Sequence, residues 1–154
     1  MSCCCVSSGG IGKFFGHFAR RYRRRYEKRG LEATQRQLVE GLRQAGFEGA
    51  SLLEIGCGVG YLHQQLLRED AARALGVDIS EAMLAQAREL ARTAGLSDRT
   101  EYRQGDFVDL AEGIAPADIA LLDKVVCCYP DAAALVVRSV SKTRRVYALT
   151  YPRD

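Results

Sequence analysis

Three glycines at alternate positions follow an apolar run in the stretch LLEIGCGVGYL, residues 52–62. They are Gly56, Gly58 and Gly60. Glycine permits tight turns and a close approach of backbone to ligand, and glycine-rich loops between a strand and a helix bind the phosphate or ribose of nucleotides. The stretch therefore predicts a loop that binds a ligand containing a nucleoside.

The residues around the glycines indicate whether the loop binds a dinucleotide or a cationic ligand. The dinucleotide fingerprint is G-x-G-x-x-G, and Tyr61 stands where its third glycine belongs. Glu54 lies two residues before Gly56, at the end of the expected strand. Its carboxylate would repel a pyrophosphate and would pair with an ammonium group. The loop therefore favours a positively charged ligand.

Two further carboxylates follow expected strands. Asp78 closes the segment LGVD, 22 residues after Gly56, a spacing at which a carboxylate accepts hydrogen bonds from ribose hydroxyls. Asp106 stands in the turn Gly105-Asp106-Phe107 after the next strand. Taken singly, each residue is equally well explained by a tight turn or a helix cap. The spacing of Asp78 supports the binding of a nucleoside without deciding which one.

With these motifs the sequence resembles the class I S-adenosylmethionine-dependent methyltransferases of the small-molecule type found in bacteria. Their first motif, acidic-x-G-x-G-x-G, matches Glu54 and the three loop glycines. The resemblance implies S-adenosylmethionine as cofactor, with Glu54 at its amino group, Asp78 at its ribose and Asp106 at its adenine. The residues implied to contact it are Glu54, Gly56, Cys57, Gly58, Gly60, Tyr61, Asp78, Ile79, Met83, Asp106, Phe107 and Asp123.

The sequence says less about the molecule that would accept the methyl group, the acceptor. Methyl transfer from a sulfonium needs alignment, exclusion of water and a place for the acceptor's proton, so no catalytic residue is assigned. The segment LLDKVVCCYPD lacks the proline-rich motif of enzymes that methylate base amines, and its cysteines precede the proline, unlike those of cytosine C5 enzymes. The resemblance implies a small-molecule acceptor, with Tyr22, Tyr26 and Tyr129 as candidate contacts. His17 and His63 are interpreted as packing or surface residues.

The elements that must position these residues alternate along the chain. Short apolar runs predict strands near 51–55, 73–77, 100–103, 117–122 and 145–150, and helical periods predict helices near 60–69, 80–94 and 131–141. This alternation predicts an α/β fold, a Rossmann-like, doubly wound and mostly parallel sheet of about five strands with helices on both faces. The family sheet has seven strands, so the resemblance, over about residues 31–151, implies a member that lacks the last two.

A basic arm precedes this domain. Residues 13–29 carry a local excess of seven positive charges, whereas the chain as a whole has a net charge of only +3. We expect a flexible leader up to residue 12 and a basic amphipathic helix within residues 1–30, followed by the cofactor-binding domain at 31–154. The favoured role of the helix is a lid over the donor pocket. Nucleic acid is the less favoured partner of its charges.

Six cysteines occur in the chain, five of them in the adjacent runs at 3–5 and 127–128. Neighbouring cysteines bridge poorly, which favours free thiols and a cytoplasmic location. No zinc-type spacing occurs, so no metal site is predicted, although the two runs together could bind a soft metal. No apolar run reaches the length of a membrane helix. The fifth strand, expected at an exposed sheet edge, favours pairing into a homodimer.

The leading hypothesis is therefore an S-adenosylmethionine-dependent methyltransferase that acts on a small molecule. One alternative is a module that binds the cofactor without catalysis. The other is an RNA-directed methyltransferase that uses the basic arm.

Overall fold

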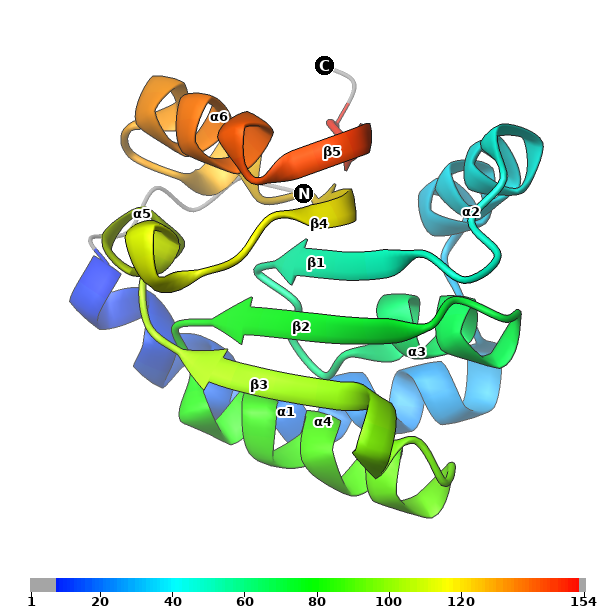
Figure 1. Ribbon diagram of the computed structural model, residues 1–154. Coiled ribbons are helices and arrows are strands. Elements are labelled where there is room, and N and C mark those ends of the chain that lie inside the picture. The colour runs from blue at the N-terminus through cyan, green and yellow to red at the C-terminus, as the bar shows by residue number, and fades with distance from the viewer. Residues whose placement is uncertain (1–7, 153–154) are drawn as a thin grey trace.

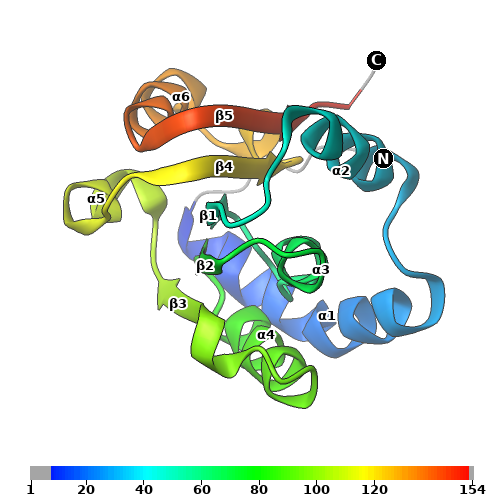
Figure 2. The same cartoon turned by 45° about the vertical axis from the view of Figure 1, so that its right-hand side comes forward.

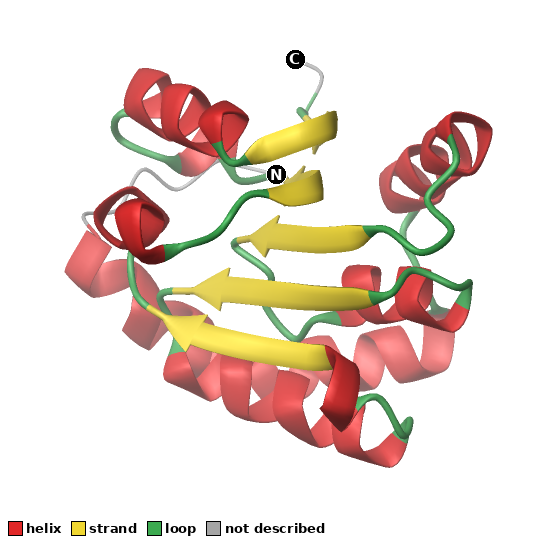
Figure 3. Cartoon of the chain, in the orientation of Figure 1, coloured by secondary structure: helices red, strands yellow, loops and turns green. Residues whose placement is uncertain are grey.

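The computed structural model describes the backbone of residues 8–152 and the side chains of residues 18–152. Its strands are β1 (Ser51–Ile55), β2 (Arg73–Asp78), β3 (Thr100–Gln104), β4 (Ala117–Asp123) and β5 (Thr143–Thr150). Its α-helices are α1 (Ser8–Arg29), α2 (Ala33–Ala45), α3 (Tyr61–Arg68), α4 (Glu81–Thr93), α5 (Phe107–Leu110) and α6 (Ala132–Ser141). Figure 1 shows the arrangement, and Figure 3 separates helices from strands.

The strands form one parallel sheet in the order β3-β2-β1-β4-β5. Side chains of a strand alternate between the two faces of a sheet. Leu52 of β1 therefore packs with α2, α3 and α4, whereas Leu53 packs with α5 and α6. These two groups of helices lie on opposite faces of the sheet (Figure 2). The predicted α/β fold, with a doubly wound parallel sheet of five strands, is confirmed.

Two boundaries differ from the sequence-based expectation. Helix α1 begins at Ser8, so the part of the expected flexible leader from residue 8 to residue 12 is helical, and that prediction was wrong there. The missed helix α5 has only four residues, too few to show a helical period. It begins where the side chain of Asp106 accepts a hydrogen bond from Val108 N at 2.9 Å.

Helix α1 lies along α4, next to the glycine loop (Figure 1). The buried Ala19 of α1 packs with Met83 of α4 and with Val59 of the loop. Close to the end of α1, the ring of Tyr26 stacks on Tyr61, with centroids 4.9 Å apart. The basic arm is thus packed on the domain by its small and aromatic residues.

Strand β5 forms one edge of the sheet, as expected. Leu149 on β5 is 41% exposed, and Val137 and Val140 on the neighbouring α6 are also exposed. No helix in the described part of the chain is long and apolar enough to span a membrane.

Candidate functional site

The carboxyl ends of β1, β2, β3 and β4 meet at one edge of the sheet, because the strands are parallel neighbours (Figure 1). Glu54, Asp78 and Asp123 lie at or next to the ends of β1, β2 and β4, and Asp106 follows β3. The four carboxylates that the sequence singled out therefore come together at the edge where open α/β sheets bind ligands.

The three loop glycines adopt left-handed backbone angles, with φ of 67° at Gly56, 55° at Gly58 and 77° at Gly60. A Cβ atom at Gly56 would lie 2.6 Å from Val125 Cγ2, and one at Gly60 would lie 2.8 Å from His63 Cε1. At Gly58 it would meet nothing within 4 Å. Gly58 therefore faces open space, where a ligand can approach the backbone.

Four of the loop's backbone N–H groups already have acceptors within the protein. Those of Gly56 and Cys57 donate to Val77 O at 2.8 and 3.1 Å, and that of Gly60 donates to Cys57 O at 2.9 Å. Gly58 N donates to Asp78 Oδ2 at 2.8 Å. Loops that bind phosphate point several free N–H groups at the anion. These four N–H groups are not available for that purpose.

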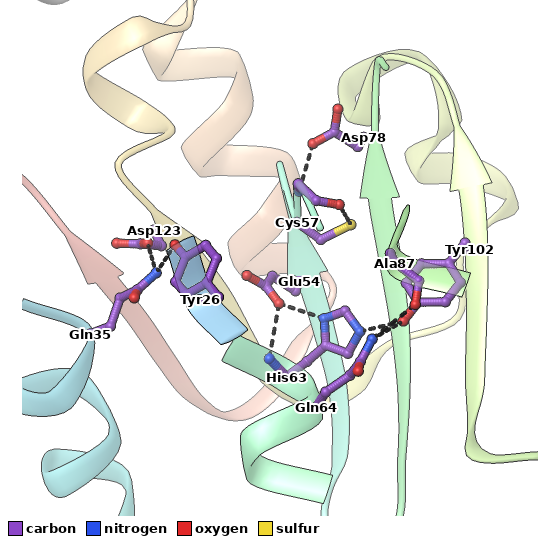
Figure 4. Close-up of polar contacts among 11 residues, drawn as sticks. Tyr26, Gln35, Glu54, Cys57, His63, Gln64, Asp78, Ala87, Tyr102 and Asp123 are labelled. Carbon is purple, nitrogen blue, oxygen red and sulfur yellow. Dashed lines mark hydrogen bonds and ion pairs between the residues drawn. The ribbon is translucent and has the colours of Figure 1, made fainter. Parts of the chain in front are cut away.

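Glu54 occupies the N-terminus of α3. Its Oε2 accepts hydrogen bonds from His63 N at 3.2 Å and from His63 Nδ1 at 2.6 Å, and both residues are buried (Figure 4). Helix N-termini after glycine loops hold the pyrophosphate in dinucleotide-binding proteins, and here a protein carboxylate takes that place. Burial raises the pKa of Glu54, and the hydrogen bond from His63 opposes the rise.

Further polar contacts hold the buried pair of Glu54 and His63 in place. His63 Nε2 lies 2.8 Å from Tyr102 Oη, which also accepts a hydrogen bond from Gln64 Nε2 at 3.0 Å. Gln64 Nε2 bonds Ala87 O of α4 as well (Figure 4). Burial raises the pKa of Tyr102. His63 is thus a fully buried packing residue that also contacts Glu54, a contact that sequence reasoning missed.

Asp78 and Asp106 are both held by backbone N–H groups. Asp78 Oδ1 accepts from Ser80 N at 2.9 Å, in addition to the bond from Gly58, and burial raises the pKa of Asp78. Asp106 also accepts a hydrogen bond from the hydroxyl of Tyr129, which lies 2.8 and 2.9 Å from its two oxygens. The structure thus places Tyr129 against the predicted adenine contact, and its contact with the acceptor stays a prediction.

Asp123 joins the sheet to both N-terminal helices. Gln35 Nε2 of α2 donates to Asp123 Oδ2 at 2.7 Å and to Tyr26 Oη of α1 at 2.9 Å (Figure 4). Thr150 of β5 donates to Asp123 Oδ1 at 2.5 Å. Gln35 is 3% exposed, and burial raises the pKa of Tyr26 to about 12. We call Tyr26, Gln35 and Asp123 the latch. Sequence reasoning missed Gln35.

Other predicted contacts have different surroundings. Cys57 is buried, and its Sγ is the first atom that a Cβ at Gly76 would meet, so its side chain packs on β2. Met83 packs between α4 and α1, and the ring of Phe107 lies in the core. Tyr22 is exposed on α1, and it belongs neither to the latch nor to the glycine loop. The contacts of these four residues with the cofactor or the acceptor stay predictions.

Ile79 is partly exposed after β2, next to Asp78. Within the described residues, no group of three or more His, Cys, Asp or Glu side chains is arranged to hold a metal ion. The sulfur atoms of Cys127 and Cys128 lie 3.4 Å apart. The cysteines at 3–5 and the side chain of His17 lie outside the described residues.

A family model described as a methyltransferase domain matches residues 52–146, which is more than half of the chain. The match spans the glycine loop, the second and third strands, and the latch carboxylate Asp123. The chain belongs to the methyltransferase domain family. The predicted membership in the class I methyltransferases is thereby confirmed.

Individual methyltransferases cover the chain to different extents. Ribosomal protein L11 methyltransferase of Deinococcus radiodurans is 36% identical over 76 residues, which are 49% of this chain and 28% of that protein. Ubiquinone biosynthesis O-methyltransferase of Methylococcus capsulatus is 31% identical over 137 residues, which are 85% of this chain and 55% of that protein. The chain thus spans from about a quarter to about half of the length of these two relatives.

The fold also matches solved methyltransferase structures. Magnesium protoporphyrin IX methyltransferase from Synechocystis PCC 6803, crystallised with bound S-adenosylmethionine, aligns with a TM-score of 0.76 and 20% identity. The alignment covers 100% of this chain and 80% of that structure. This likeness supports the Rossmann-like methyltransferase fold.

Proposed function

We propose that the chain is an S-adenosylmethionine-dependent methyltransferase that acts on a small molecule. The observation that carries this proposal is the carboxylate of Glu54 at the N-terminus of α3, beside a loop whose N–H groups bond the protein itself. An anionic ligand would meet a negative charge there, whereas a ligand with an ammonium group would be attracted. The family match and the solved neighbours support the same cofactor.

The residues present fit this cofactor. In the described part of the chain, Glu54 Oε1 has no hydrogen bond, so it can accept one from an ammonium group. Gly58 leaves open space beside the loop, and Asp78 stands at the end of β2, where a carboxylate can hold ribose hydroxyls. When bound, S-adenosylmethionine supplies a methyl group on a positively charged sulfur.

The chain's own residues then have positioning roles. Glu54, held by His63, fixes the amino group of the donor, and Asp106, held by Tyr129, fixes its adenine end. Both oxygens of Asp123 already accept hydrogen bonds, so we assign Asp123 to holding α1 and α2 over the site rather than to taking a proton. In this proposal α1 is a lid on the domain formed by residues 31–154.

The basic face of α1 supports a second candidate, an RNA-directed methyltransferase. Arg20, Arg21, Arg24, Lys28 and Arg29 are all exposed. Exposed basic side chains bind phosphates without sequence specificity. A module that binds the cofactor without catalysis, a cytoplasmic location and a homodimer paired through β5 also stay predictions.

Isothermal titration with S-adenosylmethionine, S-adenosylhomocysteine and NAD tests the ligand class. We expect both adenosyl ligands to bind and NAD not to bind. Tight binding of NAD without binding of S-adenosylmethionine would contradict the proposal. Methyl transfer from labelled S-adenosylmethionine to small acceptors and to RNA then separates the small-molecule enzyme, the RNA-directed enzyme and the non-catalytic module.

A further inference from the structure

A cluster of charges lies beside the latch and has no part in holding the donor. It consists of Glu32, in the connection between α1 and α2, Arg25 on α1 and Lys124 directly after β4. Glu32 Oε1 lies 3.3 Å from Arg25 Nη2, and Glu32 Oε2 pairs with Lys124 Nζ. One carboxylate therefore neutralises two cations from distant parts of the chain.

This cluster is connected directly to the latch. Gln35 Oε1 accepts a hydrogen bond from Glu32 N at 2.9 Å, while its Nε2 bonds Tyr26 and Asp123. Arg25 also lies over the ring of Tyr26, with Cζ 5.0 Å from the ring centroid. A molecule held by Arg25 and Lys124 would therefore lie against the latch, at the edge of the sheet where the donor site is proposed.

The cluster has a donor without an acceptor. Arg25 Nη1 is buried and has no hydrogen-bond partner, and it is the one such side-chain nitrogen or oxygen in the described residues. A buried donor without a partner costs free energy, which a ligand oxygen at that place would recover. This donor without a partner points to an additional oxygen acceptor.

We propose that the methyl acceptor carries a carboxylate group, which binds Arg25 and Lys124 in place of Glu32. The proposal rests on the proposed methyltransferase function. Arginine binds carboxylates through two parallel N–H groups, so an incoming carboxylate can use Nη1 as well as Nη2. Glu32 acts as an internal stand-in for the substrate carboxylate and competes with it for the two cations.

The competition gives the cluster an experimental signature. Glu32→Gln removes the competing carboxylate and leaves both cations, so it strengthens the binding of an external carboxylate. Arg25→Gln removes a cation and weakens that binding. A set of ion pairs that only stabilised the fold would give no gain in affinity from Glu32→Gln.

Binding of benzoate and hexanoate, each compared with its amide, benzamide or hexanamide, tests the proposal. Affinities are measured by saturation-transfer NMR on the full chain with and without S-adenosylhomocysteine. We expect the carboxylates to bind and the amides to bind more weakly. Arg25→Gln should weaken carboxylate binding by roughly tenfold, the size of one lost charge-assisted hydrogen bond, and Glu32→Gln should strengthen it.

Arg138→Gln is the matched control, because Arg138 is exposed on α6 and belongs neither to the cluster nor to the basic face of α1, and it should leave the affinities unchanged. Lys124→Gln removes the other cation of the cluster, and it does so without a change in any helix, because Lys124 lies in the loop after β4. Equal binding of acids and amides, or weaker carboxylate binding in Glu32→Gln, would overturn the proposal. Carboxylate binding that follows these variants in a chain that does not bind S-adenosylhomocysteine would support the anion site and reject the proposed methyltransferase function.

Discussion

Glu54 and Asp123 end neighbouring strands, yet their surroundings differ. The partner of Glu54 is His63, nine residues further along the chain, and both side chains are buried. The partners of Asp123 are Gln35 and Thr150, which are 88 and 27 residues away in sequence. The surroundings of Glu54 are thus built from one strand-loop-helix unit, whereas the latch is assembled from remote elements.

The two carboxylates also differ in the free energy that it costs to break their contacts. A buried pair such as Glu54 and His63 is costly to break, because the remaining carboxylate has lost its water. The contacts of Asp123 join packed elements at the mouth of the site, and the exposed ion pairs around them contribute little each. We therefore expect changes at Glu54 to affect stability and donor binding, and changes at the latch to affect mainly the acceptor.

The largest effect is expected from His63→Leu. This change leaves the buried carboxylate of Glu54 without its hydrogen bond, and we expect the free energy of unfolding to fall by about 3–5 kcal/mol. Urea denaturation measures it. His63→Asn keeps a side-chain N–H near Glu54 and should lose less. If both variants lose under 1 kcal/mol, Glu54 is not held by His63.

The glycine loop gives the next largest effect. Gly60→Ala would force a left-handed angle on alanine and place Cβ 2.8 Å from His63, so we expect a loss of roughly 2–3 kcal/mol. Gly58→Ala has the same backbone strain in open space and should lose about 1 kcal/mol.

Gly41→Ala is the control for these two variants, because Gly41 lies within α2 with free space around it. Alanine there should raise stability by about 0.5–1 kcal/mol. Thermal denaturation orders the three variants, and an equal loss at Gly58 and Gly60 would exclude the contact with His63 as a cause.

The pH dependence of donor binding tests the charge on Glu54. Burial raises the pKa of Glu54 in the free protein, whereas a bound ammonium group favours the ionised carboxylate. Affinity for S-adenosylmethionine should therefore rise with pH, by at most about tenfold per unit, until pH exceeds that pKa. Stability of the free protein has the opposite sign, because it falls as pH rises from the ordinary glutamate pKa to the raised one.

Titration calorimetry at several pH values measures the affinity, and Glu54→Gln should remove the dependence. A dependence that persists in Glu54→Gln belongs to another group.

The smallest effect on the binding of S-adenosylmethionine is expected at the latch. Gln35→Ala removes the hydrogen bonds to Tyr26 and Asp123, at a cost of about 1–2 kcal/mol. We expect faster hydrogen exchange in α1 and a higher KM for the acceptor, with the affinity for S-adenosylmethionine almost unchanged. Gln37→Ala is the control, because Gln37 is exposed on α2, the helix that also carries Gln35. An equal loss of affinity for donor and acceptor would show that the two sides of the site are not separate.

Much of the sheet and of its glycine loop was predictable, because the signals for them in the sequence are local. The apolar runs predicted all five strands to within two residues, and the spacing of Glu54, the glycines and Asp78 predicted their common edge. Parallel strands with short connections bring their carboxyl ends together whatever the details of packing. The side-chain directions of Cys57 and Met83 could not be predicted, because they depend on packing against β2 and α1, which lie elsewhere in the sequence.

The sequence by itself determined the alternation of strands and helices, the left-handed glycine loop and the carboxylates that follow the strands. Only the tertiary structure decided that Glu54 is held by His63, that Tyr129 bonds Asp106, and that Gln35 ties α1 and α2 to Asp123. The physical reason is distance along the chain. Periodicity and capping act over a few residues, whereas these contacts join surfaces that meet only after the helices have packed on the sheet.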